Sequence, residues 1–473
     1  MSDNKKYFIK TFEEERSNRF KFLFLALTFF LVIGAYTLIR DLKNAIFIGL
    51  VGKEYIPYAR IMFPLILIPA VLFYSKLVDR VRRYYLLSFY SIFFAIMCLI
   101  FAFFVGHPVI GIANTDQSPY RLFGWLFFFF VEGFSPFVLG VFWAFSNSIN
   151  TPKSAKKNYG FMVSGSQLGG MFTAGFAWAL FSLTSFPVFG VMTDVSKMRL
   201  ILVFASLLLF AVPLVIKLLM VVIPGKHLHG YEAAYKVEKE RGKAGKAKTG
   251  MFAGLKMLIK YPYVLGIFSM VFLYEVLNSI LSYLRLGVAQ QQGKSIVGIS
   301  AFLFKWVFIM QAVGLVISLL GTSSLLRKLG TRTCVGLIPI IMGAGALCFI
   351  FTDVPFIVMT AFTLMKSVNY AFSKPVVESL YIPTLKEIKF KSKSWIDAFG
   401  SKLAKTMGSG FNGLAEHVKQ INFAMFGPMH AFAFAIIIGI WAISAFFLGK
   451  RFDSAIESNE VIGLEKERLE PKN

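Results

Sequence analysis

The strongest constraint on this chain is a series of apolar runs, each about as long as a bilayer is thick. They include residues 22–39, 86–105, 122–145, 200–223 and 431–448. About 20 residues of helix cross the roughly 30 Å of hydrocarbon in a membrane. Backbone groups in lipid must hydrogen-bond within their own segment, and runs of this length favour helices over barrel strands. The chain is 56% hydrophobic and 16% charged, whereas soluble domains are about 25% charged. The sequence therefore predicts an all-α integral membrane protein.

Hydropathy predicts about twelve membrane spans. The eleventh is the weakest of them, because it carries Lys402 and Lys405. The predicted spans are residues 22–39, 61–77, 85–106, 122–146, 159–183, 199–223, 262–284, 302–322, 334–352, 354–376, 396–421 and 428–448.

The two halves of the chain resemble each other. Gly165-Ser-Gln-Leu168 in the fifth span parallels Gly400-Ser-Lys-Leu403 in the eleventh, and Arg40 and Arg285 end the first and seventh predicted spans. We therefore predict two six-helix halves in a major-facilitator-like architecture, in which substrate binds near the midplane between the halves. The predicted boundaries are residues 1–224 and 262–449 for the halves, 225–261 for a basic cytoplasmic linker and 450–473 for a cytoplasmic tail.

Lys and Arg concentrate in the loops after even-numbered spans, for example Arg80, Arg82 and Arg83, while residues 107–120 hold none. The positive-inside rule then predicts that both termini are cytoplasmic. This topology accounts for much of the formal charge of +25, so no nucleic-acid partner is expected. The segment before the first span lacks the pattern of a cleavable secretory signal and contains acidic residues 13–15, which favours a bacterial inner membrane.

Charged residues within spans indicate where the function lies, because each costs about 2.5–3.5 kcal/mol to insert. Cations outnumber acids among them, which predicts a positive cavity that attracts a polyanion. For Arg40, Lys43, Arg285 and Lys305 the alternative is snorkelling to the headgroups from a span end, whereas the span around Glu132 is otherwise apolar. The candidates are Arg40, Asp41, Lys43, Glu132, Glu275, Arg285, Lys305, Lys366, Lys374, Glu378, Lys402 and Lys405.

No P-loop, nucleophile elbow or metal-ligand spacing is found in the sequence. We therefore expect no enzyme activity, no metal site and no cofactor.

Three motifs resemble those of the ATP/ADP translocases of obligate intracellular bacteria and plastids. They are Leu38-Ile-Arg-Asp-Leu-Lys43, the segment Phe142-Trp-Ala-Phe-Ser-Asn147, and a block that runs from Tyr381-Ile-Pro383 through residues 389–397 to Gly400-Ser-Lys-Leu-Ala-Lys405. The resemblance implies a nucleotide transporter that exchanges ATP for ADP. It also implies that Lys43 contacts phosphate, that Glu132 is the fourth-span Glu needed for transport, and that Lys391 and Lys393 take part in nucleotide handling.

Two positions depart from the family pattern. Asn44 stands where the family has a second Asp, and Ser282 aligns with a family Glu, two helical turns after Glu275. A proton-coupled or exchange transporter of another nucleotide or organic anion is therefore the alternative function. A non-transporting scaffold or sensor is the alternative of another class, and the oligomeric state stays open.

Overall fold

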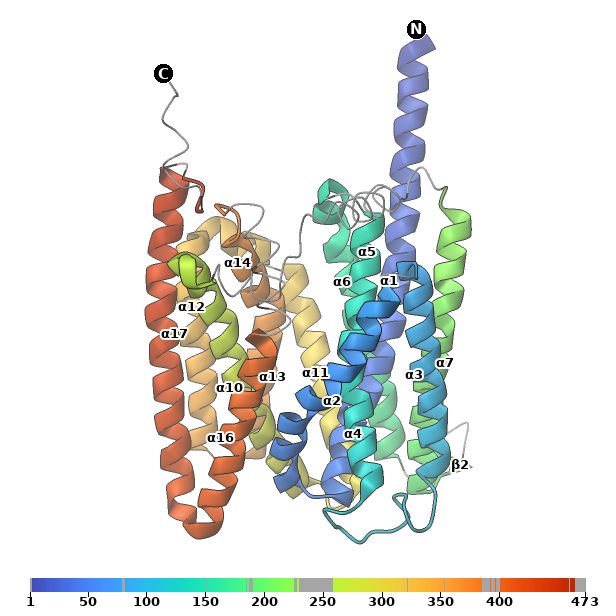
Figure 1. Ribbon diagram of the computed structural model, residues 1–473, viewed down its shortest axis with the longest axis vertical. Coiled ribbons are helices and arrows are strands. Elements are labelled where there is room, and N and C mark those ends of the chain that lie inside the picture. The colour runs from blue at the N-terminus through green and yellow to red at the C-terminus, as the bar shows by residue number, and fades with distance from the viewer. Residues whose placement is uncertain are drawn as a thin grey trace. The chain divides into compact units, whose positions relative to one another are not determined.

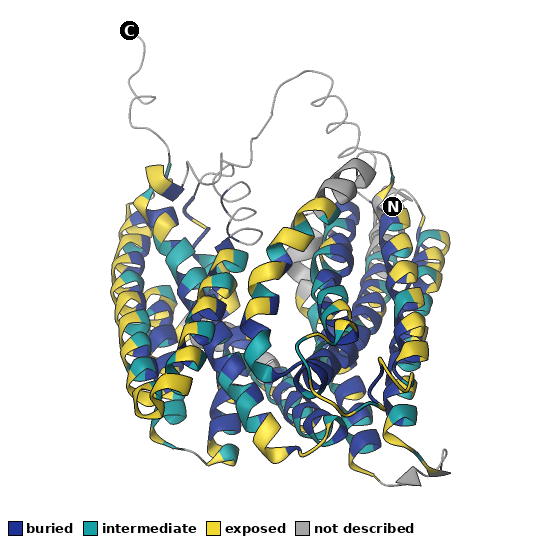
Figure 2. Ribbon diagram, turned by 60° about the horizontal axis from the view of Figure 1, so that its bottom comes forward, coloured by how far each residue is buried: buried dark blue, intermediate teal, exposed yellow. Residues whose placement is uncertain are grey.

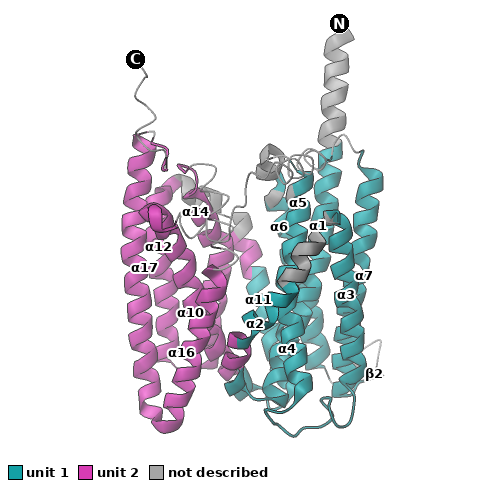
Figure 3. Cartoon of the chain, viewed as in Figure 1, with its two compact units in different colours: residues 1–55, 62–247, 289–312 teal, residues 56–61, 248–288, 313–473 magenta. Residues whose placement is uncertain are grey.

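The computed structural model describes residues 2–78, 81–150, 152–183, 185–186, 190–224, 228, 258–320, 322–352, 354–384, 392, 396, 400–458 and 460–463. The chain forms two compact units (Figure 3). Unit 1 comprises residues 1–55, 62–247 and 289–312, and unit 2 comprises residues 56–61, 248–288 and 313–473. The predicted linker, residues 225–261, lies outside the described residues apart from 228 and 258–261.

Long helices dominate both parts of the chain (Figure 1). Up to residue 222 the elements are α1 (Ser2–Leu50), η1 (Lys53–Tyr55), α2 (Ile56–Val78), α3 (Arg83–Phe104), α4 (Leu122–Phe134), η2 (Ser135–Leu139), α5 (Gly140–Ile149), α6 (Pro152–Ser182), β1 (Ser185–Phe186), β2 (Gly190–Val191) and α7 (Asp194–Val222). The two short strands pair antiparallel, with Ser185 opposite Val191.

From residue 262 the elements are α10 (Pro262–Gln292), α11 (Ile296–Leu320), α12 (Thr322–Phe351), α13 (Pro355–Val368), η4 (Asn369–Ser373), α14 (Lys374–Ser379), α16 (Ser401–Ile421), η6 (Phe423–Met425) and α17 (Phe426–Glu457).

The predicted all-α membrane fold is confirmed. Over its described residues, each of the twelve predicted spans overlaps a helix or a run of consecutive helical segments. Within the described part of the chain, eight helices are long and apolar enough by themselves to cross a membrane. Large apolar side chains such as Leu65, Phe103 and Phe432 are exposed on the helices, and many exposed positions follow the outer face of α17 (Figure 2). In a membrane protein, lipid covers such surfaces.

Two helices extend beyond their predicted spans. The first span was expected to end at residue 39, but α1 continues to Leu50, and α10 continues past residue 284 to Gln292. Charged residues lowered the local hydropathy there without ending the helix. Arg40, Lys43 and Arg285 therefore lie inside helices, where snorkelling is less able to explain them.

Close packing of α1 against α6 organises unit 1. A Cβ atom added at Gly165 would lie 2.6 Å from the backbone oxygen of Ala26, and one added at Gly169 would collide with the backbone oxygen of Phe30. Glycines spaced four residues apart allow two helix backbones to approach this closely. Gly165 and Gly169 therefore allow α6 to pack directly on the backbone of α1.

A similar contact joins α10 and α16 in unit 2. A Cβ atom at Gly408 would lie 2.6 Å from the Cβ atom of Ser279, and the hydroxyls of Ser279 and Ser409 are 3.3 Å apart. Nδ2 of Asn412 donates to the backbone oxygen of Ser279 at 3.2 Å. Small and polar residues of this kind hold membrane helices together, and α16 coincides with the weakest of the predicted spans.

Both units contain a π-helical segment in the middle of a long helix. η2 interrupts the helix between α4 and α5, and η4 interrupts the helix between α13 and α14. Pro136 lies within η2, and Pro375 follows η4 by two residues. Single-turn π segments are rare and occur frequently at functional sites.

Candidate functional site

An ion pair between α1 and α4 forms the centre of the charged cluster in unit 1. Nζ of Lys43 donates a short hydrogen bond to Oε1 of Glu132. The Lys43 side chain is 4% exposed and that of Glu132 is 29% exposed. The Lys43 ammonium also lies 4.3 Å from the ring centroid of Phe128, a distance typical of a cation–π contact. These contacts neutralise a buried cation and leave one edge of the Glu132 carboxylate accessible.

Arg40 and Asp41 form a second pair on α1. Nη2 and Nε of Arg40 lie 2.8 and 3.1 Å from Oδ2 of Asp41, whose side chain is buried. The Arg40 guanidinium also lies 5.5 Å from the ring centroid of Tyr36. The structure therefore places Arg40, Asp41 and Lys43 on one helix of unit 1, with Asp41 and Lys43 buried and Arg40 half-buried.

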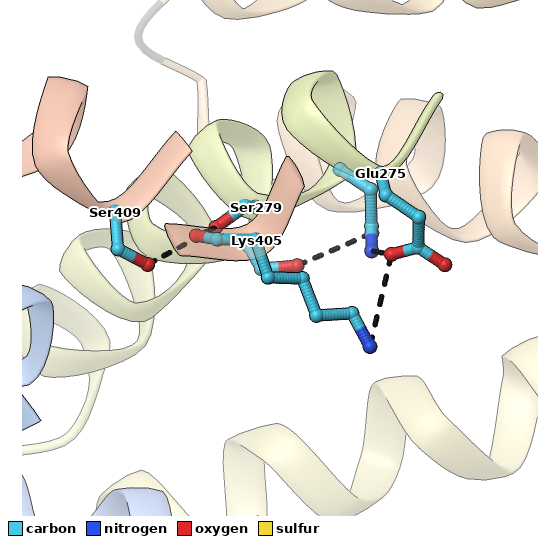
Figure 4. Close-up of polar contacts among 6 residues, drawn as sticks. Glu275, Ser279, Lys405 and Ser409 are labelled. Atoms are coloured by element: carbon cyan, nitrogen blue, oxygen red, sulfur yellow. Dashed lines mark hydrogen bonds and ion pairs between the residues drawn. The ribbon is translucent and has the colours of Figure 1, made fainter. Parts of the chain in front are cut away.

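In unit 2, α10 and α16 bring Glu275 and Lys405 together. Nζ of Lys405 is 3.8 Å from Oε2 of Glu275, and Nδ2 of Asn278 donates to the same oxygen at 3.3 Å (Figure 4). Lys366 and Lys374 also act electrostatically on the Glu275 carboxylate. Lys405 is the ion-pair partner of this carboxylate, and the charges of Lys366 and Lys374 also act on it, so positive charge is in excess in this part of unit 2.

A hydrogen-bonded chain links Glu275 to Ser282 along α10. Oγ of Ser282 donates to Oδ1 of Asn278 at 3.3 Å, and Asn278 donates onward to Glu275. Glu275 and Ser282 each lie about one helical turn from Asn278, on opposite sides of it along α10. Glu275 is therefore connected to Ser282 through one side chain.

Lys366, Arg285 and Lys374 lie among aromatic rings. The Lys366 ammonium is 5.9 Å from the centroids of Phe362 and Tyr370 and 6.0 Å from that of Tyr274. Arg285 lies 5.2 Å from the centroid of Phe362, and Lys374 lies 4.6 Å from that of Tyr370. Ring faces attract cations at these distances.

The remaining predicted site residues are placed less centrally. Lys402 is half-buried on α16, whereas Glu378 on α14 and Lys305 on α11 are exposed. Lys391 and Lys393 lie outside the described residues. The motif segment that begins at Phe142 packs into unit 1, where the Phe142 ring stacks on that of Phe29 with centroids 4.5 Å apart.

The aromatic and amide side chains around these charges were not predicted from the sequence. Tyr274, Phe362 and Tyr370 surround Lys366, and Asn278 joins Ser282 to Glu275. A search restricted to charged residues passes over them. Polar uncharged residues such as Asn278 and Asn369 within apolar spans were the signal that could have found them.

Each unit thus holds basic groups that are paired with carboxylates within membrane-spanning helices. An ammonium held by a carboxylate can transfer its hydrogen bonds to a phosphate oxygen without becoming unpaired, because phosphate offers more charge and more acceptor oxygens. The arrangement is therefore suited to bind and release a polyanion in a low-dielectric environment.

Comparison with known protein families gives one match across most of the chain. The family model described as TLC ATP/ADP transporter matches residues 2–363. ADP,ATP carrier protein 4 of Rickettsia bellii is 26% identical over 445 residues, which cover 84% of this chain and 83% of the relative. ADP,ATP carrier protein 1 of Rickettsia prowazekii is 23% identical, with 94% and 96% covered. ADP,ATP carrier protein 1 of Chlamydia pneumoniae is 26% identical, with 93% of each covered.

Solved structures with a similar fold are membrane transporters. A bacterial homologue of the human lysosomal transporter Spinster has a TM-score of 0.58 at 15% identity and covers 93% of this chain and 98% of its own. The D-xylose–proton symporter scores 0.59 at 15% identity, with 90% and 96% covered. A bacterial homologue of ferroportin scores 0.62 at 10% identity, with 90% and 98% covered. At these identities the likeness concerns the fold, which is the major-facilitator-like fold predicted from the sequence.

Proposed function

Because this chain belongs to the TLC ATP/ADP transporter family, we propose that it carries nucleotides across a membrane by alternating access, taking ATP in exchange for ADP. The relatives are named ADP,ATP carriers and are similar over nearly the full length of both chains. Within the structure, the observation that carries the proposal is the pairing of Lys43 with Glu132 inside unit 1. A transporter of polyanions needs a buried cation that can be neutralised when no substrate is bound.

In the proposed mechanism, Lys43 binds a phosphate of the nucleotide and releases Glu132. The triphosphate outcompetes a single carboxylate, because it carries more negative charge and can bond Lys43 and Arg40 together. When the nucleotide leaves, Glu132 takes back the Lys43 ammonium. The pair therefore lowers the free-energy cost of keeping the Lys43 cation within the membrane when no nucleotide is bound.

Unit 2 by itself also holds basic groups suited to phosphate. The Lys405 side chain is 49% exposed, and its Nζ atom is 3.8 Å from Oε2 of Glu275, which is long for an ion pair. This pair therefore opens more readily than the pair in unit 1. Lys402 precedes Lys405 by three residues, which places both on one face of α16. We assign Lys402 and Lys405 to substrate binding, together with Lys391 and Lys393, and assign Asp41, Glu275, Arg285, Lys366 and Glu378 to coupling or gating.

The partners are then a nucleotide and the lipid bilayer. We place the protein in the bacterial inner membrane with both termini in the cytoplasm, because the relatives are bacterial carriers and the basic loops of this chain follow even-numbered spans.

Proton-coupled nucleotide import is the second candidate, and the Glu275 environment favours it. Asn44 and Ser282 occupy two positions at which the family carries acids. Glu275 is linked to Ser282 through Asn278, and it could take up the proton that drives import when Lys405 binds phosphate. No such role is needed in strict exchange, in which the outgoing nucleotide supplies the driving force.

Uptake of radiolabelled ATP into proteoliposomes tests the proposal. Vesicles are prepared with internal ADP, with no nucleotide, and with no nucleotide but an imposed pH gradient. We expect uptake with internal ADP and little uptake into empty vesicles. Uptake into empty vesicles that follows the pH gradient would replace exchange by proton-coupled import.

Absence of ATP uptake under all three conditions would overturn the proposed substrate. Competition by other nucleotides and organic anions then decides whether the chain transports a different anion. If the variants Lys43→Met and Glu132→Gln left the cellular effect of the protein intact, a non-transporting scaffold or sensor would be favoured instead.

A further inference from the structure

The last residues that the structure describes, 460–463, lie against the helices of unit 2. They follow α17, which ends at Glu457. The backbone N–H of Ile462 donates to the carbonyl oxygen of Pro383 at 2.7 Å, and Ile462 forms a parallel β-bridge with Thr384. α14 and α17 end on the same side of unit 2 (Figure 1), and residues 460–463 join α17 to the turn after α14. Part of the predicted cytoplasmic tail is therefore fixed to the helices.

The side chain of Ile462 anchors this segment. It is only 5% exposed and belongs to the apolar core of unit 2, together with Leu380, Tyr381 and Phe452. Chain ends are poorly ordered unless contacts of this kind hold them. Because burial of an isoleucine side chain is strongly favourable, we expect a charged residue at position 462 to release the segment.

An ion pair and a glycine shape the segment on either side of Ile462. Nη2 of Arg451 on α17 donates to Oε1 of Glu460 at 2.6 Å, and the backbone N–H of Glu460 donates to the carbonyl oxygen of Ala455 at 2.9 Å. The ion pair is exposed, so it directs the chain more than it stabilises it. Gly463 has a φ of +104°, a conformation that residues with a Cβ atom rarely adopt. The path of the segment is thus specified at several positions.

The turn that receives the segment, residues 380–384, is held from three directions. Oη of Tyr263 on α10 donates to the carbonyl oxygen of Leu380 at 2.7 Å. Within the turn, Oγ1 of Thr384 donates to the carbonyl oxygen of Tyr381 at 2.8 Å. The C-terminal segment supplies the third contact. The turn contains Tyr381-Ile-Pro383, the first part of the third motif found in the sequence.

The contacts of this turn also fix the end of α14, which the turn follows directly. α14 is separated from α13 by η4, and π segments are among the places where long helices kink. Lys374 begins α14, and its charge acts on the Glu275 carboxylate. A hold on the far end of α14 restricts bending at η4, and with it the position of the Lys374 ammonium.

We propose that residues 460–463 form a C-terminal latch that positions α14, and with it Lys374, for nucleotide binding. This inference rests on the proposed function. Ile462 is the positioning residue, and the backbone of Pro383 and Thr384 receives it. The Lys374 ammonium adds to the positive charge that attracts a polyanion, so release of the latch weakens nucleotide binding.

The latch stays closed during transport. All of its contacts join residues of unit 2, and alternating access is largely a rigid-body movement of one half of a transporter against the other. Release of the latch should therefore change the KM for nucleotide and leave the maximal rate nearly unchanged. A variant that only misfolds shows the opposite pattern, because it lowers the amount of active protein without changing the KM.

Two truncated chains give the first test. A chain that ends after Ser458 lacks the latch, whereas the control that ends after Leu464 keeps it and lacks only the residues beyond. In proteoliposomes loaded with ADP, we expect loss of the latch to raise the KM for ATP three- to tenfold, with the maximal rate within twofold of wild type. The control should match wild type in both quantities.

Substitutions at position 462 give the second test in the full chain. Ile462→Asp places a charge in the apolar core and should reproduce the raised KM of the shorter truncation. Ile462→Val keeps the anchor apolar and should stay within twofold of wild type. An equal KM for the two variants would show that burial of this side chain is not what positions α14.

A disulfide across the β-bridge tests the latch within one protein. The chain carries Thr384→Cys and Ile462→Cys, with its three natural cysteines replaced by alanine. Bridge partners lie about 5 Å from each other, within the range that a disulfide spans. The reduced protein lacks the isoleucine anchor and should have the raised KM. Oxidation should restore the wild-type KM, and either cysteine alone should not respond to oxidant.

Four results would overturn the latch. They are a KM unchanged by its removal, an equal KM in the two truncated chains, failure of the cysteine pair to cross-link, and uptake that stops on oxidation and returns on reduction. The last result would show that the segment must open during transport. If wild-type vesicles take up no nucleotide, the proposed function fails and the positioning role fails with it. Uptake by wild type with an unchanged KM in the latch variants removes the latch alone.

Discussion

Glu132 and Lys366 occupy the same position relative to a π-helical segment. Each lies three residues before its first residue, which is Ser135 in η2 and Asn369 in η4. The separation in sequence between Glu132 and Lys366 differs by one residue from the separation between Gly165 and Gly400. Gly165 and Gly400 begin the Gly-Ser motifs that are repeated in the two halves of the chain. The two units therefore carry opposite charges at corresponding positions.

The ion pairs of the two units also differ. In unit 1 the helix with the π segment supplies the carboxylate of Glu132, and α1 supplies the ammonium of Lys43. In unit 2 the helix with the π segment carries Lys366, whereas the carboxylate of Glu275 on α10 pairs with Lys405 of α16. A duplicated scaffold has thus been given two different charge arrangements, one centred on a tight pair and one with excess positive charge.

The Lys43–Glu132 pair predicts unequal effects of neutralising its two members. Glu132→Gln leaves the buried Lys43 ammonium without a counter-charge, and it should lower the free energy of unfolding by about 3 kcal/mol. Lys43→Met leaves the more exposed Glu132 carboxylate and should cost less. Both variants should lose ATP uptake. Thermal unfolding in detergent, measured beside uptake, checks the order.

The double variant Lys43→Glu with Glu132→Lys separates folding from transport. It restores the ion pair and should regain most of the lost stability. It should not regain transport, because the ammonium then comes from α4 instead of α1. Uptake at the wild-type level by this variant would show that Lys43 is not a phosphate ligand.

Lys405 should behave differently from Lys43, because its pair with Glu275 is longer and half-exposed. Such pairs contribute about 0–1 kcal/mol to stability. Lys405→Gln should therefore change the unfolding temperature little and raise the KM for ATP about tenfold, which corresponds to about 1.4 kcal/mol of binding free energy. A large drop in stability with an unchanged KM would make Lys405 a structural residue.

The hydrogen-bonded chain from Ser282 to Glu275 predicts a rescue. Glu275→Gln should reduce uptake about tenfold, because it removes the carboxylate that pairs with Lys405. Adding Ser282→Glu should restore part of the uptake, since the new carboxylate is within reach of the same Asn278 amide. If the double variant were no more active than Glu275→Gln alone, Glu275 would not substitute for the family carboxylate.

The contact between α1 and α6 predicts a steep dependence on side-chain size at Gly169. Gly169→Ala forces a methyl group into the backbone of Phe30 and should destabilise the protein by about 1–3 kcal/mol. Gly160→Ala on the same helix is the control, because a Cβ atom there meets nothing within 4 Å. It should leave stability unchanged or raise it slightly. Equal unfolding temperatures of the two variants would argue against close packing at Gly169.

Much of the fold was accessible from local patterns. Apolar runs of about 20 residues can be satisfied in lipid only as helices, so the helical membrane class and the approximate positions of the spans follow from hydropathy. The repeated Gly-Ser motifs indicated the duplication, and the rarity of charges within spans identified Lys43, Glu132, Glu275 and Lys405 as candidates. These properties belong to each segment by itself and do not depend on how the segments pack together.

Which charged side chains pair with each other, and how deeply they are buried, was decided only by the tertiary structure. Lys43 finds Glu132 on a helix 89 residues away, and it does so because the face of α1 that carries Lys43 packs against α4. From hydropathy, the first span was predicted to end before Arg40. The helix continues, because its charged residues are neutralised by contacts with other side chains that local hydropathy does not take into account. Sequence determines which segments enter the membrane through their transfer free energy. Tertiary packing decides which buried charges meet, because that depends on how closely and at what rotation the helices approach.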